Sequence, residues 1–241
     1  MPGTAPIAIL AIGSRGDVQP RVVLGRELRS RGYPVRVLTS GRYAGIVTDA
    51  GLEHFPLSID IEAMLQSVDW QIWHDGEGPA GMTRSFSRIV LSITETVLAE
   101  VVAGCAGAQA ILSSSWGSVG YPVAESYGIP CAFLSLQPGE PTRAFPHLEV
   151  SPDRSLGGLV NRASYTLAEQ RAWKMIRSRT NRWRTQSLGL PPLPLSGPLA
   201  LTRRLRLPVL CGFSTHVVPR PPDWGPHIHL TGYWVPEPAG A

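Results

Sequence analysis

The sequence predicts an α/β protein with a Rossmann-like, doubly wound parallel sheet, and three observations support this fold class. Residues 7–12 are all apolar and too few for a stable helix, which is typical of a strand buried on both faces. A glycine turn follows, and then a helical pattern of apolar residues: Val22, Val23, Leu24 and Leu28. The strand-helix alternation then repeats along the chain, as expected for a parallel sheet whose strands are joined by helices.

The remaining elements are predicted from the same signals. The expected strands are residues 33–38, 52–56, 110–112, 131–136, 208–211 and 227–230. The expected helices are residues 42–50, 84–102, 119–127 and 159–187, the last with Trp173 and Trp183 packed in the core. Three stretches are predicted to be irregular: a polar, glycine-rich loop over 57–82, a loop over 137–150 and a proline-rich connector over 188–198.

Composition indicates an ordinary globular chain. Its 241 residues are 43% hydrophobic and 17% charged, and no internal repeat divides them, so residues 1–235 are predicted to form one domain and residues 236–241 to begin a linker. The net charge is +4, and Lys174 is the one lysine among 22 basic residues. The densest basic cluster, residues 171–184, is interpreted as a solvated helix face, because no nucleic-acid-binding motif accompanies it.

The chemistry of the cysteines and histidines suggests no metal or redox centre. Cys105, Cys131 and Cys211 have neither metal-ligand nor redox spacing, which predicts reduced thiols in a cytoplasmic protein. His227 and His229 alternate on a predicted strand without further ligands, so no metal site is expected. The sequence predicts neither a signal peptide nor a membrane span, since the first apolar run enters the glycine turn directly and no apolar run reaches about 18 residues.

The glycine turn after the first strand is the most informative stretch. It reads Gly-Ser-Arg-Gly-Asp-Val-Gln-Pro over residues 13–20 and does not match the Gly-x-Gly-x-x-Gly pattern of dinucleotide-binding turns. Asp17 would also repel a pyrophosphate. As a helix cap, Asp17 would accept hydrogen bonds from free backbone amides, and Pro20 is tolerated in the same first turn. A general base is the alternative. Local physics alone favours the cap, because a capping position lowers the pKa of the carboxyl group, whereas a general base needs a pKa near the operating pH.

Residues 13–20 resemble the first-turn signature of sterol glucosyltransferases and of bacterial natural-product glycosyltransferases with the two-domain GT-B fold. Weaker matches follow in the expected order: Ser-Ser-Ser-Trp-Gly at 113–117, Gly-Ile-Pro at 128–130 and Thr-Gly-Tyr-Trp at 231–234. Together they cover nearly the whole chain, which would be the amino-terminal, acceptor-binding half of such an enzyme.

The resemblance implies an inverting, hexosyltransferase-type reaction that moves a sugar from a nucleotide-sugar co-substrate to a hydroxyl of a natural-product or lipid-like aglycone, with no further cofactor. Asp17 would be the general base, and the turn residues Gly13, Ser14, Arg15 and Gly16 would lie near the donor, their amides facing phosphate or acceptor. The acceptor would be bound by Trp70, Trp73, His74, Trp116 and the loop 137–147, which begins with Gln137.

The resemblance also implies a second domain that binds the donor, and no stretch of these residues matches its His-x-Gly-Ala-Gly-Thr-type loop. Three interpretations remain open: a piece of a complete glycosyltransferase, a natural half that pairs with a separate donor domain, or a non-catalytic acceptor-binding module in which Asp17 is only a cap. In each case the isolated domain is expected to be inactive.

Overall fold

The computed structural model describes residues 4–65, 95–114, 119–150 and 154–236. Its strands are β1 (Ile7–Leu10), β2 (Val35–Ser40), β3 (Glu53–Leu57), β4 (Ala110–Ser114), β5 (Cys131–Ser135), β6 (Val209–Cys211) and β7 (Ile228–Leu230). They form one sheet in the order β3-β2-β1-β4-β5-β6-β7, and every neighbouring pair is parallel. The predicted fold class is therefore confirmed. The strand order reverses between β1 and β4, where open α/β sheets place their ligand crevice.

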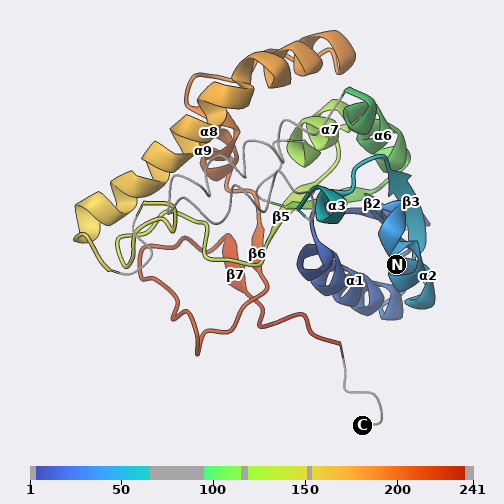
Figure 1. Cartoon of the computed structure of the whole chain (residues 1–241), viewed down its shortest axis with the longest axis horizontal. Helices are drawn as coiled ribbons and strands as arrows, with labels where there is room; N and C mark the ends of the chain where they lie inside the picture. The colour runs from blue at the N-terminus through green and yellow to red at the C-terminus, as the bar shows by residue number, and fades with distance from the viewer. Residues whose placement is uncertain (1–3, 66–94, 115–118, 151–153, 237–241) are drawn as a thin grey trace.

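Helices cover both faces of this sheet (Figure 1). They are α1 (Arg15–Ser30), a 3-10 turn η1 (Gly41–Tyr43), α2 (Ala44–Asp49), α3 (Ile61–Leu65), α6 (Glu95–Cys105), α7 (Gly120–Tyr127), α8 (Gly158–Ser187) and α9 (Gly197–Arg204). Side chains alternate along β1: Ile9 packs in a cluster with residues of α1 and α2, whereas Ala8 and Leu10 pack with residues of α6 and α7. This alternation explains why the strand is apolar throughout.

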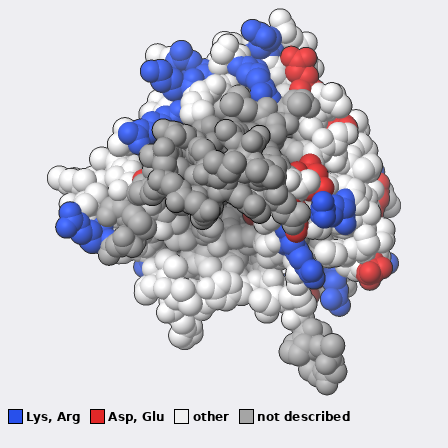
Figure 2. All heavy atoms as spheres, viewed as in Figure 1, with Lys and Arg blue, Asp and Glu red and all other residues white. Residues whose placement is uncertain are grey.

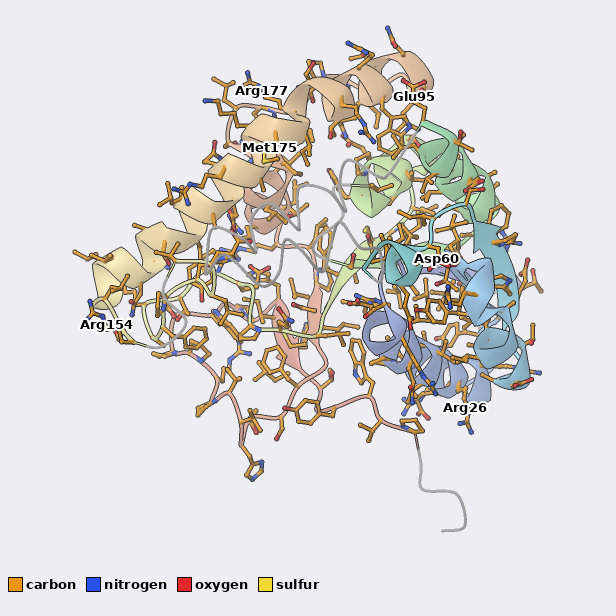
Figure 3. The ribbon with its side chains drawn as sticks, viewed as in Figure 1. Arg26, Asp60, Glu95, Arg154, Met175 and Arg177 are labelled. Carbon is orange, nitrogen blue, oxygen red and sulfur yellow. The ribbon has the colours of Figure 1, made fainter. Side chains whose placement is uncertain are left out.

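The long helix α8 runs along one edge of the molecule with α9 packed beside it (Figure 1). Its Trp173 and Trp183 are 3% and 8% exposed, so both are buried as predicted. Basic side chains gather along this edge (Figure 2), and Figure 3 labels Arg154, just before the start of α8, and Arg177, within the helix. Arg184 is an exception to the predicted solvated face, because it is buried against Glu125 of α7.

Three predicted boundaries are wrong in ways that local pattern could not resolve. The polar loop predicted over residues 57–82 contains α3, which lies beside Asp60 (Figure 3). The connector predicted over 188–198 ends two residues earlier, at helix α9, which was not predicted. Gly197 and Pro198 form its first turn, where the N–H that proline lacks would have no partner in the helix. Ser113 and Ser114 continue β4 rather than beginning its exit turn, since both pair with β5. The predicted helix residues 84–94 lie outside the described residues.

No helix in the described ranges is both long enough and apolar enough to cross a membrane. The three cysteines are free and buried, and burial raises the pKa of Cys105, Cys131 and Cys211 to about 12. A thiol with so high a pKa is almost entirely protonated at neutral pH and is a poor nucleophile.

Candidate functional site

The turn after β1 holds the carboxylate of Asp17 against the first turn of α1. Ser14 is the residue that precedes the helix, and its backbone N–H donates to Oδ2 of Asp17 over 3.1 Å. The Ser14 hydroxyl lies 3.4 Å from the same oxygen. Asp17 therefore caps its own helix, as the local sequence predicted. Its side chain nevertheless stays 44% exposed, so the carboxylate also faces solvent at the carboxyl end of β1.

Gly13 makes room for this carboxylate. Its φ of +153° is in the region that favours glycine, and a Cβ at this position would lie 2.3 Å from Oδ2 of Asp17. No side chain can occupy that space without displacing Asp17. The position of the Asp17 carboxylate therefore requires a glycine at residue 13.

Arg21 lies beneath Asp17 and was missed by the sequence prediction. Its guanidinium is 2% exposed, lies 3.6 Å from Oδ1 of Asp17, and donates to the Asp17 backbone carbonyl. Burial lowers the pKa of Arg21, and the nearby Asp17 opposes this effect. The spacing of four residues on one helix was the available signal, because such pairs are neighbours on a helix surface.

The acceptor-binding residues predicted from the sequence fall into two groups. Trp70, Trp73, His74 and Trp116 lie outside the described residues. Gln137 is described: it is exposed, follows β5, and its backbone carbonyl accepts a hydrogen bond of 2.6 Å from the Ser135 hydroxyl.

Gln137 lines a cavity of about 140 Å³ between the loop after β5 and the helices α8 and α9. Three chain segments form its walls: residues 135–149 of the strand end and loop, residues 168–176 of α8, and residues 196–203 around α9. Most of the lining is apolar, including Leu148, Ala168, Ala172, Ile176 and Leu199. An apolar concavity with few polar groups is typical of a small-molecule site.

The polar side chains of the cavity differ in how well they are paired. Arg203 donates to both carboxylate oxygens of Glu169, over 2.7 and 2.6 Å. Burial alone would lower the pKa of Arg203, but these bonds to Glu169 raise it. Burial lowers the pKa of His147, although Glu149 and Glu169 oppose this effect. With a lowered pKa, the ring is mostly neutral at neutral pH.

Glu140 is the unpaired acid of this cavity. It is 9% exposed, and its Oε2 has no hydrogen-bond partner among the described residues. Burial raises the pKa of Glu140, and the positive charge of Arg203 offsets part of this rise. Trp173 is similar, since its buried Nε1 also lacks a partner in the described part of the chain.

The unpaired carboxyl predicts a pH-dependent gain in stability for Glu140→Gln. A folded-state pKa above the ordinary 4.5 means that, above pH 4.5, the native chain binds more protons at Glu140 than the unfolded chain does, so its contribution to stability falls as pH rises. The variant removes this dependence. We expect its Tm to exceed that of the wild type at pH 7 and the difference to shrink towards pH 4. A lower Tm for the variant at pH 7 would mean that the carboxylate has a stabilising partner.

Asp17 and the cavity both lie at the carboxyl ends of the parallel strands. Asp17 follows β1 and the cavity follows β5, and β4 separates these two parallel strands. Two strand spacings correspond to about 10 Å.

Among the described residues, no group of three or more His, Cys, Asp or Glu side chains is arranged to hold a metal ion. His227 precedes β7 and His229 lies within it.

Comparison with known proteins identifies the group to which this fold and turn belong. The model of the glycosyltransferase family 28 N-terminal domain matches residues 7–146, which is more than half of the chain. The chain belongs to this glycosyltransferase family. The matched residues include Asp17 and Glu140, whereas α8 and α9, which form the other walls of the cavity, lie beyond the match.

Two fungal sterol 3-beta-glucosyltransferases are similar in sequence to this family 28 chain. The protein from Neurospora crassa is 29% identical over 234 residues, and that from Yarrowia lipolytica is 32% identical over 231 residues. These alignments cover 97% and 94% of this chain but only 15% of each relative. The chain therefore spans a small part of the curated relatives that it matches.

Solved glycosyltransferases share the fold of this family 28 chain. The kitacinnamycin glycosyltransferase superposes with a TM-score of 0.61 at 19% identity. The alignment covers 100% of this chain and 54% of the kitacinnamycin enzyme. SsfS6 from Streptomyces sp. SF2575 superposes with a TM-score of 0.52 at 22% identity. The alignment covers 96% of this chain and 55% of SsfS6. The chain has the architecture of about half of these two enzymes.

Proposed function

We propose that this chain is the acceptor-binding half of an inverting glycosyltransferase and that Asp17 is its general base. The observation that carries the proposal is the position of the Asp17 carboxylate: it is fixed by Ser14 and Gly13 at the carboxyl end of β1, next to the point where the strand order reverses. A base at this place faces the crevice in which an acceptor would meet a donor.

The proposed reaction is a single displacement. Asp17 takes the proton of the acceptor hydroxyl while that oxygen forms a bond to the anomeric carbon of the sugar, and the bond from this carbon to the phosphate oxygen breaks. The nucleoside diphosphate leaves from the opposite face, so the configuration of the sugar inverts. Among the turn residues Gly13, Ser14, Arg15 and Gly16, the Ser14 amide is bonded to Asp17, and the amides of the other three would stabilise phosphate charge at the start of α1.

The donor-binding domain is proposed to lie outside this chain, either in the same polypeptide or in a separate subunit. Support comes from the solved glycosyltransferases, of which the chain matches about half. Residues 1–235 would be the acceptor domain and residues 236–241 the start of the linker, and the chain alone would not turn over. The apolar cavity favours a natural-product or lipid-like aglycone. The enzyme is proposed to be cytoplasmic.

The configuration of the product tests this proposal. The enzyme that combines this chain with its donor domain is incubated with an α-linked nucleotide sugar and a steroid alcohol, and the anomeric coupling constant of the product is measured by NMR. We expect a β-glycoside. An α-glycoside would overturn the inverting mechanism and the role of Asp17 as a simple general base.

A non-catalytic acceptor-binding module is the second candidate. The specific observation in its favour is that the bonds between Asp17 and Ser14 explain the position of the carboxylate as a cap without any chemistry. This candidate predicts tight binding of the steroid alcohol but no transfer with any nucleotide sugar or donor domain.

A further inference from the structure

Two residues that line the cavity beside α8 each carry a buried polar atom without a partner. Oε2 of Glu140 and Nε1 of Trp173 have no hydrogen-bond partner among the described residues, and the two side chains are 9% and 3% exposed. Buried polar atoms are almost always paired in folded proteins, so an unpaired atom that lines a cavity needs an explanation. A ligand in the cavity provides one.

Glu140 cannot easily turn out to solvent, because its loop is held at both ends. The Ser135 hydroxyl donates to the Gln137 carbonyl, and Trp224 Nε1 donates to the Glu140 carbonyl over 3.2 Å. Three residues further on, the Arg143 backbone N–H donates one hydrogen bond to Asp223 over 2.8 Å. The carboxyl group is thus kept within the cavity wall.

The Trp173 ring is equally confined. Gly197, at the start of α9, lies so close to it that a Cβ there would be 3.0 Å from the indole Cγ. The other acid on the facing helix, Glu169, is already paired by both of its oxygens with Arg203. Glu140 is therefore the carboxyl group of this cavity that is both buried and free to bind a ligand group.

The chemistry of the two atoms defines the ligand group. Glu140 accepts a hydrogen bond when ionised, and the Trp173 N–H only donates. A hydroxyl group can donate to the former and accept from the latter, and it carries no charge that the apolar walls would exclude. The remainder of the ligand must be apolar, to match Leu148, Ala172 and Ile176.

The separation of the two strand ends sets the scale of the ligand's length. The carboxyl ends of β1 and β5 are two strand spacings apart, or about 10 Å. A ligand that contacts both Asp17 and Glu140 has to bridge this separation, which a small alcohol does not. A rigid polycyclic molecule with hydroxyl groups at its two ends can.

We propose that the acceptor is an extended apolar diol, with one hydroxyl at Asp17 for transfer and the second bound in the cavity by Glu140 and Trp173. This inference rests on the proposed function, because it assigns the specificity of the same acceptor site.

Calorimetric titration of the chain with two probes tests the inference. The first probe is a steroid diol with hydroxyls at opposite ends of its ring system, and the second is the dimethyl ether of that diol, which has no hydroxyl hydrogen to donate. For the diol, we expect Glu140→Leu to weaken binding by about tenfold to a hundredfold relative to the wild type. For the ether, the same substitution should leave the affinity unchanged within about twofold. Any contribution of Asp17 cancels, because it is the same in both proteins.

Control variants separate binding from folding. Glu140→Gln retains a hydrogen-bond acceptor and should bind the diol within about tenfold of the wild type. Glu27→Gln changes an exposed carboxyl of α1, outside the cavity lining, and should leave both affinities unchanged. Trp173→Phe should weaken both probes alike, because an ether oxygen still accepts from the indole.

The outcomes distinguish this inference from the proposed function. Equal loss of both probes in folded Glu140→Leu would overturn the inference and leave the acceptor role intact. If the wild-type chain binds neither probe, the proposed acceptor role fails, and the diol inference fails with it.

Discussion

Asp17→Asn is expected to lower the rate of sugar transfer by a factor of roughly 10²–10⁴, the usual contribution of a general base. The amide oxygen of asparagine can still accept the hydrogen bond that the Ser14 backbone N–H donates over 3.1 Å. The cap and the space over Gly13 are therefore retained, and only the ability to take a proton is lost. The measurement is kcat in the complete enzyme, with acceptor affinity followed by calorimetry and Tm by thermal unfolding.

Ser14→Ala is the matched control for this experiment. It removes the hydroxyl that lies 3.4 Å from Oδ2 of Asp17 and costs about 1 kcal/mol of cap stability, but it leaves the carboxylate in place. We expect transfer by Ser14→Ala to stay within about tenfold of the wild type. If Asp17→Asn transfers sugar as fast as the wild type, Asp17 is a cap only, and the non-catalytic interpretation of this residue is correct.

Arg184→Met is expected to lower the free energy of unfolding by about 3 kcal/mol, at the lower end of the range for breaking a buried ion pair because Glu125 is partly exposed. Arg184 is 1% exposed, and its guanidinium donates to Glu125 of α7 over 2.9 Å and to the Pro191 carbonyl over 3.0 Å. The substitution leaves the Glu125 carboxylate and this carbonyl without their donor. For a chain of this length, Tm should fall by roughly 6–12 °C.

Arg182→Met provides the comparison, because Arg182 is two residues away on the same helix but exposed. Surface substitutions usually change stability by less than about 0.5 kcal/mol. Similar losses for the two variants, measured by urea unfolding, would show that the contact between α8 and α7 does not depend on Arg184.

Much of the fold could be predicted because its signals are local. The apolar run of residues 7–12, the glycine turn and the spaced apolar residues of α1 all depend on neighbours within a few positions. The cap of Asp17 is local too, since Ser14 is three residues away. Arg21 could have been found by the same reasoning, because it is four residues from Asp17 on the same helix.

The cavity could not be predicted in this way. Gln137 and the loop after it were expected to contact an acceptor, but Glu140, Trp173 and Arg203 come from three segments that only the packing of α8 and α9 brings together. Trp173 was correctly predicted to be buried, yet burial alone does not show that its N–H lacks a partner. Helix α9 was not predicted at all, and its first residues were assigned to the connector because proline-rich sequence is typical of a connector and also of a first helical turn.

The sequence by itself determined the parallel sheet, the glycine turn and the place of Asp17 at the end of the first strand, because each depends on the period of apolar residues or on the φ of one glycine. The tertiary structure alone decided that Arg184 is buried with Glu125, and that Glu140 is left unpaired in a cavity between the loop after β5 and the helices α8 and α9. The physical reason is that pairing, desolvation and cavity shape depend on residues far apart in the chain, which only the packed helices and strands bring into contact.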